Sequence, residues 1–422
     1  MISNLSYGAN QNLRLEIDPD ALVADCLPPP GMNQADTVNA AARAAQSPLD
    51  FPPLCQATVP GDRVVIALGP DVPQAAEVVA AIVPELLAGG NAPAHISVLQ
   101  APISFSAHQP RGESGCAHDP RNSLPADLRE TVKWITHHPS EQGEMSYLAA
   151  DAQGAPLYLN RLLCDADLVV PVGCLRLHYS NSLNGEAGLW NDSIYPTFGD
   201  RNTLDHFSAN GVPLTVGQVA HRHRQVDQVA WLLGIQITAQ VIPGNGERAF
   251  RVLAGTPEAV FLQGHALCRS AWQQQVPQRA GLVVAGIGGG SAFQTWNHVG
   301  RALEAALRVV SEGGAIVLCT QLNEPWGPAL KLLASSTDLA ATQALLRKQR
   351  SADAALARRM AELVERASVY LLSALPEESV SPLGFAHIHD ASEFSRLISH
   401  HDSCILLPDA QHAWPVVTGE ED

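Results

Sequence analysis

The chain has 422 residues, a hydrophobic fraction of 46% and a formal net charge of -16 at pH 7. This length predicts two or three domains, each with an ample core. The acidic balance argues against a nucleic acid polymer or an anionic membrane surface as the main partner. Almost all basic residues are arginines, and the lysines are Lys133, Lys331 and Lys348. Chemistry that needs a lysine, such as a Schiff base, is therefore restricted to these positions.

The start of the chain has no basic segment followed by an apolar one, so no signal peptide is indicated. The apolar runs are too short to cross a bilayer. The eight cysteines are scattered without a CxxC pair, which favours reduced thiols over a disulfide framework or a zinc ribbon. We therefore expect a soluble cytoplasmic protein, and its oligomeric state stays open.

The first part of the chain predicts an α/β unit. A strand is expected at 13–17 and a helix at 37–45, after a proline-rich loop. The buried strand expected at 61–69, the helix expected at 73–90 and the strand expected at 95–100 then form a βαβ pattern.

Two loops in this part are candidate site segments. Residues 107–125 are polar and rich in glycine and proline, and residues 174–212 show little periodicity. Loops that follow parallel strands often carry the functional residues of α/β proteins. Around them, the pattern predicts a helix of about two turns at 157–164, a buried strand at 168–173, two strands within 235–253 and a helix at 256–275.

The βαβ pattern restarts after residue 279. The elements expected there are a strand at 280–286, a helix at 295–310, a strand at 315–320, helices at 326–335 and 337–366, a strand at 368–375 and a last strand near 404–409. The sequence thus predicts an α/β fold of two domains, each a mainly parallel sheet flanked by helices, with a cleft between them. The expected N-terminal domain is 1–274, which residues 404–422 could complete, and the C-terminal domain is 275–403.

The glycine loop after the strand at 280–286 precedes a helix, where backbone N–H groups can hold a phosphate or a carboxylate. Gly288, Gly289 and Gly290 are therefore the cofactor-binding candidates. The spacing is not GxGxxG, and no acidic residue stands at the expected later strand end. A tight turn, an anion contact and a dinucleotide site all remain open.

Three of the 16 histidines follow predicted core strands in irregular segments: His108, His178 and His206. One such residue is usually a hydrogen-bonded loop residue, but three at the same sheet edge favour a functional site. His387 and His389 share one face of a predicted strand and could suit a metal.

In the placement of these histidines and of the glycine loop, the chain resembles lactate racemase and its relatives, the nickel-pincer-nucleotide racemases and epimerases of 2-hydroxy acids. The resemblance extends from about Gly61 to Leu375 and depends on the order and spacing of segments. These segments are GDRVVIALGPDVPQ, ISVLQAPISFSAHQP, LNRLLCDADLVVPVG, LRLHYSNSLNGE, FRVLAGTPEAVF and GLVVAGIGGGSAFQTWNHVGRALEAALRVVSEGGAIVLCT.

The resemblance implies a small 2-hydroxy acid substrate and hydride transfer to a nickel-pincer nucleotide. It implies that His108 and His178 are the acid/base pair on opposite faces of the substrate carbon. It further implies that His206 ligates nickel, which imidazole suits.

The sequence departs from the family at the cofactor and the substrate carboxylate. Gly188 stands where the family has the lysine that attaches the nucleotide, and Pro70 stands where it has a substrate-binding arginine. His298 and Arg301 align with the family's substrate-binding glutamine and lysine. Arg301 could hold a carboxylate in bidentate geometry.

Three functions are consistent with this pattern, and whether the chain is an enzyme is left open. The retained histidines favour a 2-hydroxy acid racemase or epimerase. The missing lysine and arginine favour a divergent homologue that binds a small ligand or regulates without nickel chemistry. The glycine loop is the feature that favours a nicotinamide-dependent oxidoreductase.

Overall fold

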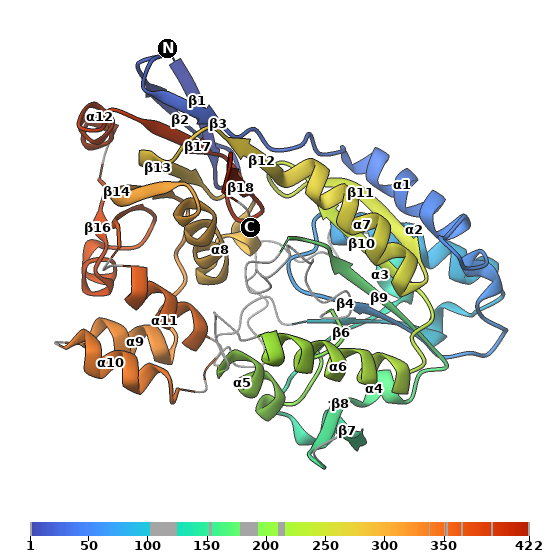
Figure 1. Ribbon diagram of the computed structural model, residues 1–422. Coiled ribbons are helices and arrows are strands. Elements are labelled where there is room, and N and C mark those ends of the chain that lie inside the picture. Colours follow the sequence, from blue (N-terminus) through green and yellow to red (C-terminus); the bar gives the residue numbers. More distant parts are fainter. Residues whose placement is uncertain are drawn as a thin grey trace.

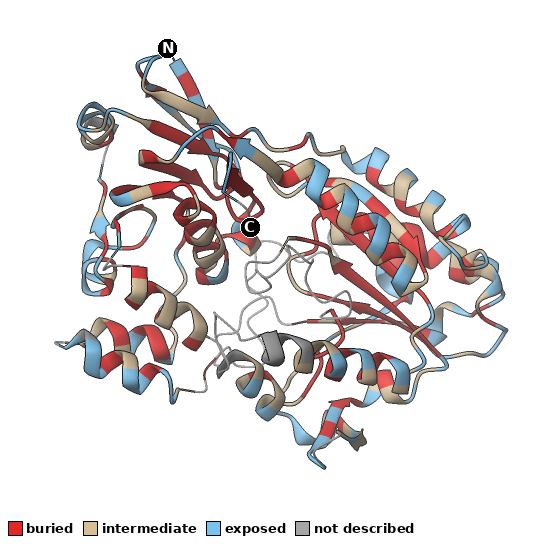
Figure 2. Ribbon diagram, in the orientation of Figure 1, coloured by how far each residue is buried: buried red, intermediate tan, exposed pale blue. Residues whose placement is uncertain are grey.

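The computed structural model describes residues 2–101, 125–151, 154–177, 193–209, 216–336, 338–349, 351, 353–363, 366–389 and 391–420. Two six-stranded sheets, each flanked by helices, form the two lobes of the molecule (Figure 1). Most residues of their central strands are buried (Figure 2). Continuous apolar runs therefore form strands that are covered on both faces, as in other parallel sheets.

The N-terminal sheet has the strand order β11-β10-β9-β4-β5-β6. The pair β10–β11 is antiparallel, and the other neighbours are parallel. Helices α1 and α2 pack on one face, and α6 packs on the other. The strands are β4 (Val64–Leu68), β5 (Ile96–Gln100), β6 (Lys133–Thr136), β9 (Leu168–Cys174), β10 (Thr238–Pro243) and β11 (Ala249–Gly255), and the helices of this lobe are α1 (Gln34–Gln46), α2 (Ala75–Ala88), α3 (Ala126–Thr131), α4 (Arg161–Cys164), α5 (Arg201–Ala209), α6 (Val216–Leu232) and α7 (Pro257–Trp272).

The C-terminal sheet is parallel throughout, in the order β16-β15-β14-β13-β17-β3. Helices α8, α9 and α11 pack on one face, whereas the hairpin β1–β2 and α12 cover the other. The elements are β1 (Ile2–Tyr7), β2 (Gln11–Glu16), β3 (Leu22–Asp25), β13 (Ala280–Gly286), α8 (Trp296–Leu307), β14 (Val310–Cys319), α9 (Pro328–Ala334), α10 (Leu339–Leu346), α11 (Ala354–Leu363), β15 (Ser368–Leu372), β16 (Ala386–His387), α12 (Ala391–Ser399) and β17 (Cys404–Leu407).

The last predicted strand lies in the C-terminal sheet, not in the N-terminal one. Strand β17 pairs with β13 on one side and with β3 on the other. The first residues of the chain thus also contribute to the C-terminal sheet, while β18 (Trp414–Val417) pairs with β12 (Gln273–Val276). An apolar run predicts that a strand is buried but does not specify its neighbours, which is why the sequence left the sheet of this strand open. The division of the chain at 274 stays a prediction.

Two local predictions were wrong. The helix expected at 157–164 is a strand in its first half, because β8 (Pro156–Asn160) pairs with β7 (Met145–Ala150). The Asn160 side chain then accepts the N–H of Leu162, which caps the short helix α4. The segment expected to be a loop at 174–212 ends in helix α5, and the helix α6 that follows was not predicted.

Two expectations about the whole chain can be compared with the described residues. The seven cysteines among them are free thiols, as expected. In the same part of the chain, no helix has both the length and the apolar character needed to cross a bilayer.

The packing of the β1–β2 hairpin gives a test of this arrangement. Leu15 is 2% exposed and lies in the cluster beneath the C-terminal sheet, so Leu15→Ala leaves a cavity there. We expect the free energy of unfolding, measured with denaturant, to fall by about 2–5 kcal/mol. Leu27→Ala is the control, since Leu27 is 65% exposed. Equal and small effects of the two changes would contradict the packing.

Candidate functional site

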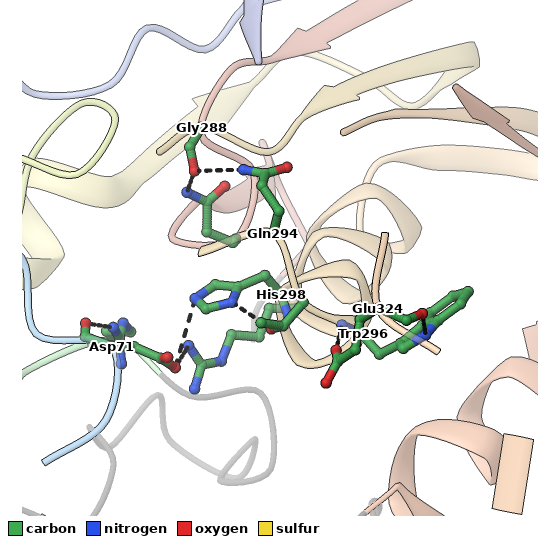
Figure 3. Close-up of polar contacts among 10 residues, drawn as sticks. Asp71, Gly288, Gln294, Trp296, His298 and Glu324 are labelled. Atoms are coloured by element: carbon green, nitrogen blue, oxygen red, sulfur yellow. Dashed lines mark hydrogen bonds and ion pairs between the residues drawn. The ribbon is translucent and has the colours of Figure 1, made fainter. Parts of the chain in front are cut away.

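The candidate site lies where the carboxyl ends of strands from both sheets meet. Asp71 follows β4 and Arg176 follows β9 in the N-terminal lobe, whereas His298 and Arg301 belong to α8 of the C-terminal lobe. Loops at the carboxyl ends of parallel strands are where α/β proteins usually bind ligands. The contacts described below join the two lobes at this place (Figure 3).

A cleft of about 440 Å³ lies beside these residues. One wall is the turn after β4, from Gly69 to Gln74, and another is Glu247 and Arg248 in the turn between β10 and β11. Phe293, before α8, closes it from the C-terminal lobe. A volume of this size with polar and apolar walls suits a small molecule.

The carboxylate of Asp71 connects the lobes. Its Oδ2 lies 3.4 Å from Arg301 Nη1 and 3.6 Å from His298 Nε2. Asp71 has a left-handed backbone with φ of 56°, which is unusual for a non-glycine residue. Burial by itself would raise the pKa of Asp71, but the neighbouring His298 and the guanidinium groups of Arg301 and Arg176 hold that pKa below its ordinary value. The carboxylate is therefore ionised at neutral pH.

His298 is held by the start of α8. Thr295 caps the helix by accepting the N–H of His298, and its hydroxyl lies 2.9 Å from His298 Nδ1. The other nitrogen, Nε2, faces Asp71 at 3.6 Å, which is beyond hydrogen-bond distance (Figure 3). Complete burial lowers the pKa of His298 to about 3, against the opposing effect of Asp71. The imidazole is thus neutral near pH 7.

The N-terminus of α8 is already occupied by an acidic side chain. The Glu324 carboxylate accepts the N–H of Trp296 at 2.9 Å, and the indole N–H of Trp296 donates to the Glu324 carbonyl at 2.9 Å (Figure 3). Carboxylates are favoured at helix N-termini. These contacts fix the position of the helix that presents His298 and Arg301.

The loop after β17 packs behind this cluster. Asp409 Oδ1 accepts the N–H of Gly246 at 2.9 Å, and Gln411 donates to the Gly288 carbonyl at 3.2 Å. Burial raises the pKa of Asp409 to about 6. His412 lies 5.4 Å from Trp272, ring to ring, and burial and then Arg176 lower its pKa far below the ordinary value.

The glycine loop makes its contacts within the protein. A Cβ on Gly288 would lie 1.9 Å from Asp409 Oδ1. Gly289, with φ of 96°, donates its N–H to the Gly8 carbonyl at 3.0 Å, and the Gly290 N–H donates to the Glu247 carboxylate at 3.0 Å. These two N–H groups are not free for a phosphate. The cofactor-binding role of the three glycines stays a prediction, and their contacts support close packing instead.

The structure brings some of the predicted site residues together and leaves others apart or outside the described residues. His298 and Arg301 meet at Asp71, as described above. His108, His178 and Gly188 lie outside the described residues. His206 is exposed on α5, where its ring lies 6.4 Å from that of Phe207. Its role as a nickel ligand stays a prediction.

The histidine pair on the C-terminal lobe has local partners. His387 and His389 are 3.2 Å apart between their Nδ1 atoms, and Nε2 of His387 lies 3.1 Å from the Leu375 carbonyl. The residues that the structure describes contain no group of three or more histidine, cysteine or acidic side chains that could hold a metal.

Asp71, Arg176, Asp409 and His412 were missed in the sequence. Each is a polar residue a few positions beyond a buried strand, at the end of β4, β9 or β17. This is the signal that singled out the three loop histidines, and it could have found these four residues too.

The described lysines do not fit a covalently attached nickel-pincer nucleotide. Lys133, Lys331 and Lys348 are all exposed, and none of them lines the cleft. Lys133 is the first residue of β6, the edge strand of the N-terminal sheet, and so lies at the opposite end of the strands from the site. Lys331 is on α9. Because the sequence has no other lysine, the chain lacks a residue for the family's covalent attachment.

The close approach of Gly288 and Asp409 predicts that Gly288→Ala destabilises the protein. The new methyl group must displace the Asp409 carboxylate, which costs about 1–3 kcal/mol of unfolding free energy. Denaturant unfolding measures the change. Gly143→Ala is the control, because no atom lies within 4 Å of a Cβ at that position. A loss no larger than that of the control would rule out this packing.

The raised pKa of Asp409 predicts a specific pH dependence. The pKa of an aspartate in the unfolded chain is about 4. Between about pH 4 and pH 6, the folded protein therefore keeps a proton on Asp409 that the unfolded chain has lost. Stability therefore decreases as the pH rises through this range, by up to about 3 kcal/mol relative to Asp409→Asn. Unfolding free energies of both proteins across this range test the prediction. Parallel pH profiles for the two proteins would refute it.

Comparison with known protein families gives a match for the first half of the chain. Residues 7–207 match a family model described as the lactate racemase N-terminal domain. No curated protein matches the sequence.

Two solved structures share the fold. The lactate racemase apoprotein from Thermoanaerobacterium thermosaccharolyticum aligns with a TM-score of 0.77 and 16% identity, covering 98% of this chain and 100% of that one. A structural-genomics target protein from Thermotoga maritima aligns with a TM-score of 0.65 and 13% identity, covering 93% and 100%. The predicted α/β fold is confirmed. The chain therefore resembles lactate racemase in fold over nearly its whole length, and its residues 7–207 match the sequence model of that family's N-terminal domain.

Proposed function

We propose that this lactate-racemase-like protein binds a 2-hydroxy acid, or a closely related small carboxylate, in the cleft between its two lobes. The observation that carries the proposal is the buried contact of a carboxylate, that of Asp71, with Arg301 and His298. A guanidinium and a neutral imidazole N–H are both donors to a carboxylate. The pair is therefore suited to a ligand carboxylate that enters beside Asp71.

The walls of the cleft fit the rest of such a ligand. Val72, Ala75 and Phe293 supply apolar surface, while Gln100 and Glu247 supply polar groups. A small acid needs one strong anchor for its charge and a few groups that orient the remainder. The cleft of about 440 Å³ is large enough for this class of ligand.

Racemisation or epimerisation of the bound 2-hydroxy acid is the second candidate function. It is favoured by the family match over residues 7–207, which includes His108, His178 and His206. In the family's chemistry, His108 and His178 would be the acid/base pair and His206 the nickel ligand. The missing lysine separates this chain from an enzyme with a covalently attached nucleotide.

Binding is tested by calorimetric titration with lactate, and lactamide serves as the uncharged control ligand. We expect lactate to bind and lactamide to bind at least tenfold more weakly, because the charge-assisted hydrogen bonds are lost. Arg301→Gln should weaken lactate binding to a similar extent. Arg43→Gln, at an exposed position on α1, should leave it unchanged. Equal affinities for lactate and lactamide would exclude a carboxylate anchor.

Turnover is tested on protein produced together with the enzymes that mature the nickel-pincer cofactor. We expect no covalent nucleotide in the intact mass, because no lysine is available to attach it. Interconversion of the lactate enantiomers that requires both His108 and His178 would establish the second candidate. Nickel analysis of the same sample shows whether metal accompanies any activity. A nucleotide adduct would contradict the expected absence of a tether.

A further inference from the structure

Arg176 is a buried cation behind the turn after β4, and that turn lines the cleft. It follows β9, has a relative exposure of 9%, and comes from the N-terminal sheet. Its Nη2 donates a hydrogen bond to the backbone carbonyl of Asp71, in the turn after the neighbouring strand β4. The guanidinium therefore lies against the turn that forms one wall of the cleft.

The hydrogen-bonding capacity of Arg176 is not met by the described residues. Its Nε–H is buried and has no hydrogen-bond partner there. The partner of Nη2, a peptide carbonyl, is neutral. A buried guanidinium costs free energy unless an anion pairs with it. The Nε–H of Arg176 is therefore a buried donor for which the described residues supply no acceptor.

Among the described residues, Asp71 supplies negative charge near Arg176, and the charge of Arg176 helps to lower the pKa of that carboxyl group. The Asp71 carboxylate is, however, already in contact with His298 and Arg301. His412, whose pKa is lowered by burial and by Arg176, is neutral, and within the described part of the chain neither of its ring nitrogens has a hydrogen-bond partner. Within the described part of the chain, the Asp71 carboxylate is thus the acidic group of this cluster, and the Nε–H of Arg176 is left without an acceptor.

We propose that Arg176 binds the carboxylate of the ligand through its Nε–H edge, opposite to the Arg301 side of the cluster. The guanidinium edge offers two N–H groups in the geometry that a carboxylate accepts. The ligand is then held between an arginine of the N-terminal sheet and the α8 residues of the C-terminal lobe. This inference rests on the proposed function, because it assigns a further binding residue to the same cleft.

The test compares Arg176→Gln with wild type by calorimetric titration, using lactate, glycolate and acetate as probes. We expect the variant to bind these carboxylates at least tenfold more weakly, because a charge-assisted pair is lost. Arg176→Lys should recover part of the affinity, since it keeps the charge but not the planar edge. Arg63→Gln is the matched control, because Arg63 is an exposed, ion-paired residue at the opposite end of β4.

A merely structural role predicts a different result. Removing a buried charge that lacks an anion should leave the melting temperature of the ligand-free protein unchanged or raise it. Probes that raise the melting temperature of wild type should then fail to raise that of Arg176→Gln. If Arg176 had a structural role alone, the substitution would lower the melting temperature of the ligand-free protein, and the folded fraction would keep the affinity of wild type.

The outcomes separate this inference from the proposed function. If lactate binds to wild type and to Arg176→Gln with the same affinity, the role of Arg176 is refuted and the proposed function stands. If acetate binds through Arg176 but neither lactate nor glycolate binds, the role of Arg176 is supported and a 2-hydroxy acid is excluded as the ligand. If none of the three probes binds to wild type, both are refuted.

Discussion

The arrangement of the site depends on one buried carboxylate shared between the lobes. Asp71 belongs to the turn after β4, while its partners His298 and Arg301 belong to α8 on the other sheet. Such a pair adds little net stability, because the cost of desolvation offsets the attraction. Separating the partners, however, leaves unpaired charge in a poorly solvated place. The contact therefore matters most for how the carboxyl ends of the two sheets are aligned.

The groups around this contact differ in the charge that they carry. Burial keeps His298 and His412 neutral, whereas Arg176 and Arg301 remain charged because guanidinium groups do not lose their proton in proteins. Neutral imidazoles donate hydrogen bonds without adding to the positive charge. The site is consequently suited to a single small anion. Its glycine loop, by contrast, is closed by protein acceptors such as the Glu247 carboxylate.

The sequence predicted the two βαβ patterns well because continuous apolar runs are characteristic of buried parallel strands. It also singled out His298 and Arg301, which α8 places beside Asp71, although their substrate-binding role stays a prediction. It predicted the strand at 404–407 but left its sheet open, because a strand buried on both faces has the same composition in either sheet. It overlooked Asp71, because a single aspartate in a turn is common and only its left-handed backbone and its largely buried side chain distinguish it.

By itself, the sequence determined the α/β class and the restriction of lysine chemistry to Lys133, Lys331 and Lys348, since both follow from composition and local pattern. Only the tertiary structure decided which strand ends face each other. Arg176 and Asp71 are 105 positions apart, and Arg301 and Asp71 are 230 apart. The pairing of β4 with β9 and the packing of α8 against the turn after β4 create these contacts. No local pattern encodes them, because they depend on which distant segments share a sheet.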